Sequence, residues 1–368
     1  MSDLLIRGGS VDVAIADGLI VQASSVGSVE TLDATGLTVL PGLLDLQVNG
    51  AAGIDVTAEP ARLWEVARAL PAYGVTAFVP TVITSDLASR ETSLATLAAG
   101  PPAGWSGAVP LGLHFEGPMI APARKGAHPE RWLTDPSLDL VEGWSRDAGV
   151  LMATIAPELP GALEVIAALV ARGVVVSVGH TEATAAQVEA AVAAGVTCLT
   201  HLGNAMAPML TREPGPVGVA LGGADLVAGV IADGHHLHPS FLVAAWRALG
   251  PARFLSVSDT TAALGLPDGA ARLGDQDVVV AAGTVRLADG TLAGSAASIV
   301  ECLRVLRRTT GCSLADAVAT ATTTAADLVG DPTRGRLDPG CRGDLTLVDD
   351  ALDVVATVIG GVLVHGGR

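Results

Sequence analysis

The chain has 368 residues, of which 50% are hydrophobic and 44 are glycines, enough to fill the core of one large α/β barrel or of two ordinary domains. Lys and Arg total 21 against 38 Asp and Glu, which gives a formal charge of −17. Nucleic acids and anionic membranes bind basic surfaces, so this charge argues against both as partners. The net charge does not exclude a small anionic substrate, because binding one needs only one or two local cations.

The cysteines and the N-terminal sequence carry no sign of export. The 4 cysteines form no CxxC pair and no disulfide-like framework. Residues 1–7 lack a basic stretch followed by a long apolar segment, and no apolar run reaches the length of a membrane span. We therefore expect a cytoplasmic protein with reduced thiols.

The first part of the chain has the pattern of a small β-structure. Residues 1–40 alternate short β-type runs with turns, and Asp17-Gly18 is a hairpin signal between residues 11–15 and 19–21. No helix of useful length fits there.

From residue 38 the pattern changes to buried strands that alternate with amphipathic helices. The expected strands lie at residues 38–45, 75–83, 108–116, 150–156, 174–179, 196–201, 226–231 and 253–258. The expected helices between them lie at residues 60–73, 87–98, 163–172, 183–194 and 240–249. This alternation is typical of an α/β fold, and it favours a (β/α)8 TIM-like barrel over an open sheet.

The last part of the chain returns to β-type sequence. Short β-runs are expected at 278–280 and 284–287, and helices at 299–309 and 314–328, before a β-type tail at 344–348 and 354–364. We expect residues 1–40 and 336–368 to pair into one small β-sandwich domain, with residues 41–335 forming the barrel.

In barrels of this kind, functional residues lie at the C-terminal ends of the strands. Here the predicted ends carry ionisable or amide side chains: Asp45, Gln47, Asn49, Glu116, Glu158, His180, His201, Asp233, His235, His236 and Asp259. Glu116 with His180 and His201 offers three ligands for a divalent metal and leaves room for water. Asp259 is the expected general base.

Each of these residues also has a purely structural explanation. Glu116 could cap a loop amide, the two histidines could be hydrogen-bonded core residues, and Asp259 could be a helix N-cap. His114 should point to the same face as Glu116, where packing and function are equally open. Arg212 could be a solvated charge paired with Glu213.

A series of short motifs runs through about residues 40–300 and begins with Pro41-Gly42-Leu43-Leu44-Asp45 after the β-rich head. The later motifs are His114-Phe115-Glu116-Gly117-Pro118, Lys125-Gly126-Ala127-His128, Gly179-His180-Thr181, Thr200-His201, Asn204-Ala205-Met206, Arg212-Glu213-Pro214-Gly215, Asp233-Gly234 with His236, Ser258-Asp259 and Leu292-Ala293-Gly294-Ser295. Together, and in this order, they resemble the amidohydrolase superfamily and, within it, the family of N-acetylglucosamine-6-phosphate deacetylases.

The resemblance implies hydrolysis of N-acetylglucosamine 6-phosphate to glucosamine 6-phosphate and acetate, with metal-bound water as nucleophile and Asp259 as general base and acid. It implies one divalent metal ion per subunit on Glu116, His180 and His201, with zinc expected, although iron, manganese and cobalt accept the same ligands. It implies six substrate-binding residues, of which the first would also be catalytic: His128, Asn204, Ala205, Arg212, His236 and Leu292. In this family a neighbouring subunit supplies part of the phosphate-binding site, so the resemblance also implies a homodimer.

Three departures from the family pattern stand out. Gln47-Val48-Asn49 replaces the His-x-His that binds a second metal in many amidohydrolases, and neutral amides are poor ligands, so we expect one tightly held metal. Gly203 replaces a bulky residue, and Thr260 replaces an Ala. The alternative functions are deacetylation of the epimer N-acetylgalactosamine 6-phosphate, hydrolysis of a cyclic amide, and a non-catalytic scaffold, which the intact ligand set argues against.

Overall fold

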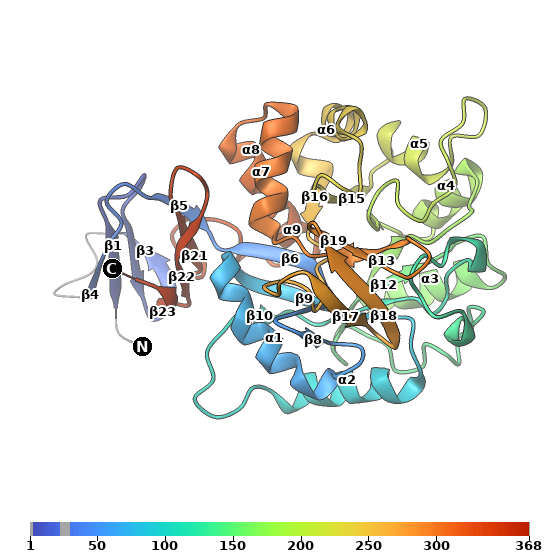
Figure 1. Ribbon diagram of the computed structural model, residues 1–368, viewed down its shortest axis with the longest axis horizontal. Helices are drawn as coiled ribbons and strands as arrows, with labels where there is room; N and C mark the ends of the chain where they lie inside the picture. The colour runs from blue at the N-terminus through green and yellow to red at the C-terminus, as the bar shows by residue number, and fades with distance from the viewer. Residues whose placement is uncertain (1–2, 23–29, 368) are drawn as a thin grey trace.

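The computed structural model describes residues 3–22 and 30–367; residues 1–2, 23–29 and 368, which belong to the predicted terminal β-segments, lie outside it. Eight parallel strands within the described residues follow one another around a barrel (Figure 1). They are β6 (Leu43–Val48), β9 (Val75–Ile83), β11 (Leu113–Glu116), β12 (Val150–Ile155), β13 (Val175–Val178), β14 (Cys198–Leu199), β15 (Val227–Ile231) and β16 (Phe254–Val257). The predicted TIM-like fold class is confirmed.

The barrel closes where β6 and Asn49, the residue directly after it, meet the residues that follow β16. Val48 forms a parallel bridge with Thr260, and the Asn49 N–H donates to the Thr260 carbonyl at 2.7 Å. The Ser258 N–H donates to Oδ1 of Asp45 at 3.2 Å. A side chain thus supplies part of the hydrogen bonding at this seam.

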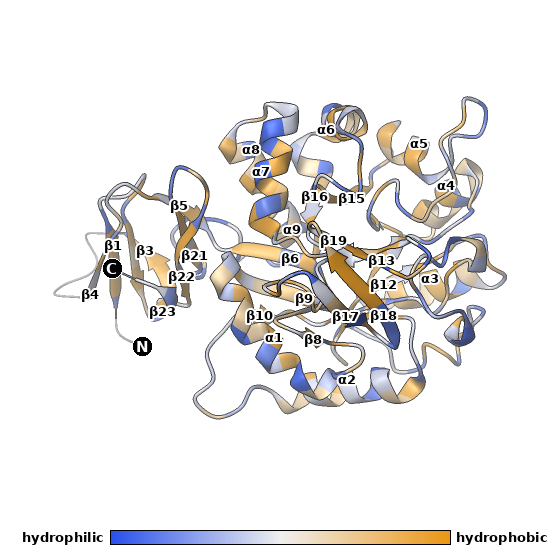
Figure 2. Ribbon diagram, in the orientation of Figure 1, coloured by the Kyte–Doolittle hydropathy of each residue, from blue (hydrophilic) through white to orange (hydrophobic). Residues whose placement is uncertain are grey.

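Helices lie around the outside of the barrel (Figure 1). They are α1 (Leu63–Ala69), α2 (Leu87–Ala99), α3 (Ala162–Ala171), α4 (Ala185–Ala193), α5 (Gly215–Leu221), α6 (Pro239–Arg253), α7 (Ile299–Thr310), α8 (Leu314–Ala319) and α9 (Thr323–Leu328). Figure 2 shows mainly hydrophobic barrel strands, whereas helices such as α7 mix hydrophobic and hydrophilic residues, as expected for elements with one face on a core. Capping boxes begin α4 and α7. Helix α5 was not predicted.

Two predicted strands are each divided in two. Residues 38–45 form β5 (Thr38–Pro41) and then β6, because the Gly42 N–H between them donates to the Asp344 carbonyl at 2.8 Å. Residues 108–116 form β10 (Val109–Pro110) and then β11, and Gly112 between them has a φ of 142°.

Two predicted helices are also interrupted. Residues 60–73 contain α1 between two 3-10 turns, Pro60–Arg62 and Leu70–Tyr73, each with a proline in its first turn. Residues 314–328 form α8 and α9, because Thr322 has the non-helical angles φ −135° and ψ −90°.

The two ends of the chain meet in a pair of four-stranded sheets on one side of the barrel (Figure 1). One sheet contains β1 (Leu4–Arg7), β2 (Val13–Ala16), β3 (Leu19–Val21) and β4 (Glu30–Asp33); the other contains β5, β21 (Leu345–Val348), β22 (Val354–Ile359) and β23 (Val362–Gly366). Strand β5 of the head pairs antiparallel with β21 of the tail. One apolar cluster joins both sheets, with Ile6 and Ile15 from the first and Leu345 and Val358 from the second. The boundaries at residues 40 and 336 stay predictions.

A further antiparallel sheet follows β16. It contains β17 (Gly269–Leu273), β18 (Gln276–Ala281), β19 (Thr284–Arg286) and β20 (Leu292–Ser295), of which only the two central strands were predicted. Its apolar side chains pack with Ile83 at the end of β9 and with Ala127 in the loop after β11, so the sheet lies beside the C-terminal mouth of the barrel. A small hairpin of β7 (Gly50–Ala51) and β8 (Ile54–Asp55) follows β6. None of the helices in the described residues has the length and apolar content needed to cross a membrane.

Candidate metal centre and active site

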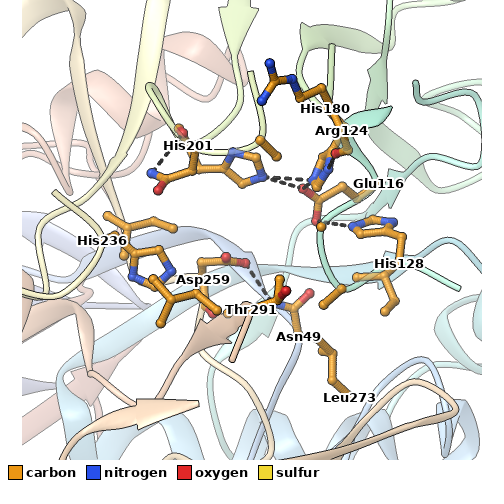
Figure 3. Close-up of a pocket in the computed structure, with 18 of the residues that line it drawn as sticks. Asn49, Glu116, Arg124, His128, His180, His201, His236, Asp259, Leu273 and Thr291 are labelled. Carbon is orange, nitrogen blue, oxygen red and sulfur yellow. Dashed lines mark hydrogen bonds and ion pairs between the residues drawn. The ribbon is translucent and has the colours of Figure 1, made fainter. Parts of the chain in front are cut away.

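Three predicted metal ligands converge at the mouth of the barrel (Figure 3). Glu116 is the last residue of β11, and His180 and His201 follow β13 and β14. Oε1 of Glu116 lies 3.1 Å from Nε2 of His180 and 3.0 Å from Nε2 of His201, and the two Nε2 atoms are 3.0 Å apart. All three residues are buried, and in the described ranges they are the one group of three or more potential ligand residues that lie together.

The hydrogen bonding of His180 fits metal ligation. Its Nδ1 lies 2.8 Å from the carbonyl oxygen of Arg124, which can only accept, so Nδ1 carries the proton and Nε2 presents a lone pair. That lone pair faces a carboxylate oxygen of Glu116, which offers only acceptors when ionised. Lone pairs that meet at 3 Å repel one another unless a cation lies among them, so the donor set fits a divalent metal ion.

Four of the predicted site residues have left-handed backbone angles. The φ values are 50° at His180, 32° at His201, 50° at Ala205 and 51° at Asp259. Non-glycine residues rarely adopt this region, and such strain concentrates at functional sites. Its occurrence at the ends of three separate strands supports a functional role for this edge of the barrel.

The predicted general base, Asp259, follows β16, and its carboxylate accepts a hydrogen bond from Asn49, the residue directly after β6. Nδ2 of Asn49 donates to Oδ1 of Asp259 at 2.8 Å, which leaves Oδ2 to exchange protons. Burial and the nearby charge of Glu116 raise the pKa of Asp259 to about 7, against the hydrogen bond from Asn49. Gln47 donates from Nε2 to both oxygens of Glu116 at 3.4 Å. The side-chain amides of Gln47 in β6 and of Asn49 directly after it therefore direct N–H groups at the two carboxylates.

His128 is a neutral hydrogen-bond donor beside the metal ligands. The backbone N–H of Thr84 donates to its Nδ1 at 3.3 Å, so the proton of the ring lies on Nε2. Nε2 is 4.0 Å from Oε2 of Glu116 (Figure 3). Burial lowers the pKa of His128 well below its usual value, which keeps the imidazole uncharged.

On the opposite wall, an ionised carboxylate orients His236 (Figure 3). Nδ1 of His236 lies 2.7 Å from Oδ2 of Asp233, whose Oδ1 accepts the backbone N–H groups of His235 and His236. Burial acts to raise the pKa of Asp233, but the side chain of His236 and the backbone N–H groups of His235 and His236 together lower the pKa below its usual value. His236 therefore donates from Nδ1 and keeps Nε2 as an acceptor.

Comparison with known proteins agrees with this geometry. The model of the amidohydrolase family matches residues 38–364. The chain belongs to the amidohydrolase family. Human N-acetylglucosamine-6-phosphate deacetylase is 38% identical to it over 379 residues, which cover 98% of this chain and 91% of the human protein.

Two solved structures are similar over almost their full length. The N-acetylglucosamine-6-phosphate deacetylase of Thermotoga maritima has a TM-score of 0.87 and 30% identity, covering 100% of this chain and 99% of that one. The enzyme from Mycobacterium smegmatis, solved as a mutant in complex with N-acetyl-D-glucosamine-6-phosphate, has a TM-score of 0.86 and 34% identity, covering 98% of each chain. The resemblance inferred from the motifs is confirmed.

One cavity of about 320 Å³ contains most of the predicted site residues. Those that line it are Glu116, His128, His180, His201, Asn204, Ala205, His236, Asp259 and Leu292. Residues not predicted to bind substrate also line it: Asn49, Ile83, Arg124, Leu273, Thr291 and Gly294. Arg124 directly precedes the Lys125–His128 motif, a position that could have drawn attention to it, whereas Leu273 and Thr291 come from the largely unpredicted sheet.

Two charged residues of the sequence analysis lie away from this cavity. Arg212 is exposed and does not line the cavity. Glu158 accepts the N–H of Glu182 at 2.6 Å and the hydroxyl of Thr181, so it holds the turn after His180.

The departure at Gly203 has a local explanation. Its φ is 84°, and a Cβ at this position would lie 3.1 Å from Cζ of Phe241. The ring of Phe241 thus occupies the space beside residue 203, and glycine satisfies both the backbone angle and the close contact.

Proposed function

We propose that this protein hydrolyses the acetamide of N-acetylglucosamine 6-phosphate to give glucosamine 6-phosphate and acetate. The observation that carries the proposal is the convergence of Glu116, His180 and His201 in one cavity with Asp259. The similarity to deacetylases of this sugar phosphate over 98% of the chain supports the substrate.

The metal centre would hold one divalent ion, with zinc as the expected metal. When bound, the ion would supply a Lewis acid that lowers the pKa of water and polarises the acetamide carbonyl. The N–H groups of Gln47 and Asn49, which point at the carboxylates of Glu116 and Asp259, argue against a second ion at β6.

Two residues would move or share protons during hydrolysis. Oδ2 of Asp259 would take a proton from the attacking water and return it to the leaving nitrogen, for which a pKa of about 7 is well suited at neutral pH. The Nε2–H of His128 would donate to the carbonyl oxygen as negative charge develops there.

The sugar phosphate would be held by Asn204, the backbone of Ala205 and Nε2 of His236. Arg212 is exposed on a loop with Met209 and Leu210, which are themselves 56% and 57% exposed. We propose that this loop packs on a second copy in a homodimer, with Arg212 reaching the partner's phosphate site. A cytoplasmic location, with all 4 cysteines free, belongs to the same proposal.

The test is acetate release from N-acetylglucosamine 6-phosphate, from the unphosphorylated sugar and from the galacto epimer. Wild type should turn over the phosphorylated gluco sugar fastest. Asp259→Asn should lose at least about a hundredfold in kcat, the usual size of general acid–base catalysis, with its metal content unchanged. A folded, metal-loaded wild type that releases no acetate from any of the three would disprove the proposal.

A further inference from the structure

A layer of polar side chains crosses the barrel interior next to the metal ligands. Its members lie in, or directly after, five neighbouring barrel strands and are at most 4% exposed: Thr81 in β9, His114 in β11, Thr154 in β12, Ser177 in β13 and Thr200 after β14. Barrels of this kind are normally filled by branched apolar residues, and a buried polar group is costly unless it is paired. Such a layer therefore calls for a physical explanation.

The five side chains form one continuous hydrogen-bonded series. Nδ1 of His114 lies 3.2 Å from Oγ1 of Thr81, and Nε2 lies 2.7 Å from Oγ1 of Thr154. Thr154 continues to Thr200 at 2.8 Å, and Thr200 to Ser177 at 2.6 Å. Because a hydroxyl donates only one hydrogen, Thr154 and Thr200 can each donate to only one of their two partners in the series, and the loss of one member disturbs the next.

The layer contacts the backbone just before each metal ligand. Thr200 directly precedes His201, and His114 lies two residues before Glu116 on the same face of β11. Gly179 directly precedes His180, and a Cβ there would lie 2.8 Å from both Cγ2 of Thr154 and Cβ of Thr200.

Thr154 has a special place in this arrangement. It lies on β12, which pairs with β11 on one side and β13 on the other and carries none of the three ligands. Its hydroxyl bonds His114, on the strand of Glu116, and Thr200, which precedes His201. Through Thr200 the series also reaches Ser177, on the strand that precedes His180.

We propose that this layer positions the metal centre: it fixes the spacing of the three ligand-bearing strands and thereby sets the affinity for the ion. Ligand sets must be held within about 0.5 Å of their productive geometry, which apolar packing alone specifies less sharply than directional hydrogen bonds. The inference rests on the metal centre of the proposed function and is independent of the sugar.

The experiment measures the zinc dissociation constant of the full-length chain by competition with a chelator, without substrate. Thr154→Val keeps the shape and removes the hydroxyl, and we expect zinc binding at least about tenfold weaker. Thr154→Ser restores the hydroxyl and should recover most of the affinity. The matched control is Thr357→Val in β22, whose buried hydroxyl donates to the Pro71 carbonyl at 2.7 Å, and which should bind zinc as wild type does.

The thermal stability of the metal-free variants separates positioning from a general loss of structure. Zinc binding of Thr154→Val equal to that of Thr357→Val would overturn the proposal, as would a loss that Thr154→Ser fails to recover. If Thr154→Val does not fold, Ser177→Ala at the end of the series decides the question: weaker zinc binding supports the proposal and unchanged binding overturns it. Because no sugar is present, a failed deacetylase assay leaves this result standing.

Discussion

At the scale of single residues, Asn49 makes the side-chain hydrogen bond to Asp259, the proposed general base. Its N–H donates to Oδ1 of Asp259 and stabilises the ionised carboxylate. Asn49→Ala should therefore shift the acidic limb of the kcat/KM profile to higher pH. A hydrogen bond to a charged group is worth about 1.5–3 kcal/mol, so kcat/KM at pH 7 should fall roughly tenfold to a hundredfold. Steady-state kinetics across pH, with metal content measured in parallel, check this.

The neighbouring Thr260 provides the control for this prediction. Its hydroxyl is buried and has no hydrogen-bond partner among the described residues, so Thr260→Ala removes this hydroxyl and the γ-methyl but no side-chain hydrogen bond. This variant should keep the wild-type pH profile. If Asn49→Ala keeps it too, Asn49 merely packs against Asp259.

The convergence of Glu116, His180 and His201 was predictable from the sequence, whereas the hydrogen-bond partners of the site carboxylates were not. Glu116, His180 and His201 stand at the ends of apolar runs, so the barrel rule alone brings them together. The contacts of Gln47 with Glu116 and of Asn49 with Asp259 join residues 69 and 210 positions apart in the chain. Such contacts depend on the registers of several strands, which no local pattern encodes.

At the scale of strands, Asp45 makes the β6–β16 seam sensitive to pH. Burial raises its pKa from 3.8 to about 6. The folded chain then binds this proton more tightly than the unfolded chain, so the free energy of unfolding falls as the pH rises from about 4 to about 6, by about 3 kcal/mol at most, and stays lower above that range.

Asp45→Asn should be more stable than wild type at pH 8, with the gain shrinking towards pH 4. The amide oxygen still accepts from Ser258, and the buried charge is gone. Asp55 serves as the comparison, because burial raises its pKa to about 6 as well. Unlike Asp45, it accepts backbone N–H groups with both carboxylate oxygens, including the N–H of Gly274. Asp55→Asn loses one of these bonds and should be destabilised at both pH values. Urea unfolding at pH 4 and pH 8 checks both, and an Asp45→Asn less stable at pH 8 would contradict the argument.

Strands made of consecutive buried residues were predictable from the sequence. Elements whose bounds depend on contacts with residues far away in the chain were not. Strand β9 is buried at every position and was predicted with the observed bounds. Strand β17 has a single buried residue, Leu273, and resembles a loop in the sequence. The break between β5 and β6 depends on Asp344, some 300 residues further along the chain, and no pattern around Gly42 reveals it.

At the scale of the whole molecule, one buried ion pair joins the terminal sheets to the barrel. Arg334 binds Asp344 and also Asp331, the latter at 3.0 Å, and the side chains of Arg334 and Asp344 are 7% and 4% exposed. The Asp344 carboxylate accepts a hydrogen bond from the backbone N–H of Gly360 at 2.8 Å. The backbone carbonyl of Asp344 accepts one from the N–H of Gly42, the residue at which the chain passes from the terminal sheet to the barrel. The charge of Arg334 thus supports the point at which both parts of the fold meet.

Arg334→Met should lower the free energy of unfolding by about 3 kcal/mol, because it leaves the buried carboxylate of Asp344 with Arg342 as its remaining cation, at 3.2 Å. Asp344→Asn added to Arg334→Met should recover part of the loss, since the charge that lacked a partner is removed. The exposed pair of Arg62 with Glu65 is the control, and Arg62→Met should cost under about 1 kcal/mol. Urea unfolding of these variants and of wild type measures the differences. A loss for Arg334→Met no larger than for Arg62→Met would show that the terminal sheets are held to the barrel by apolar packing instead.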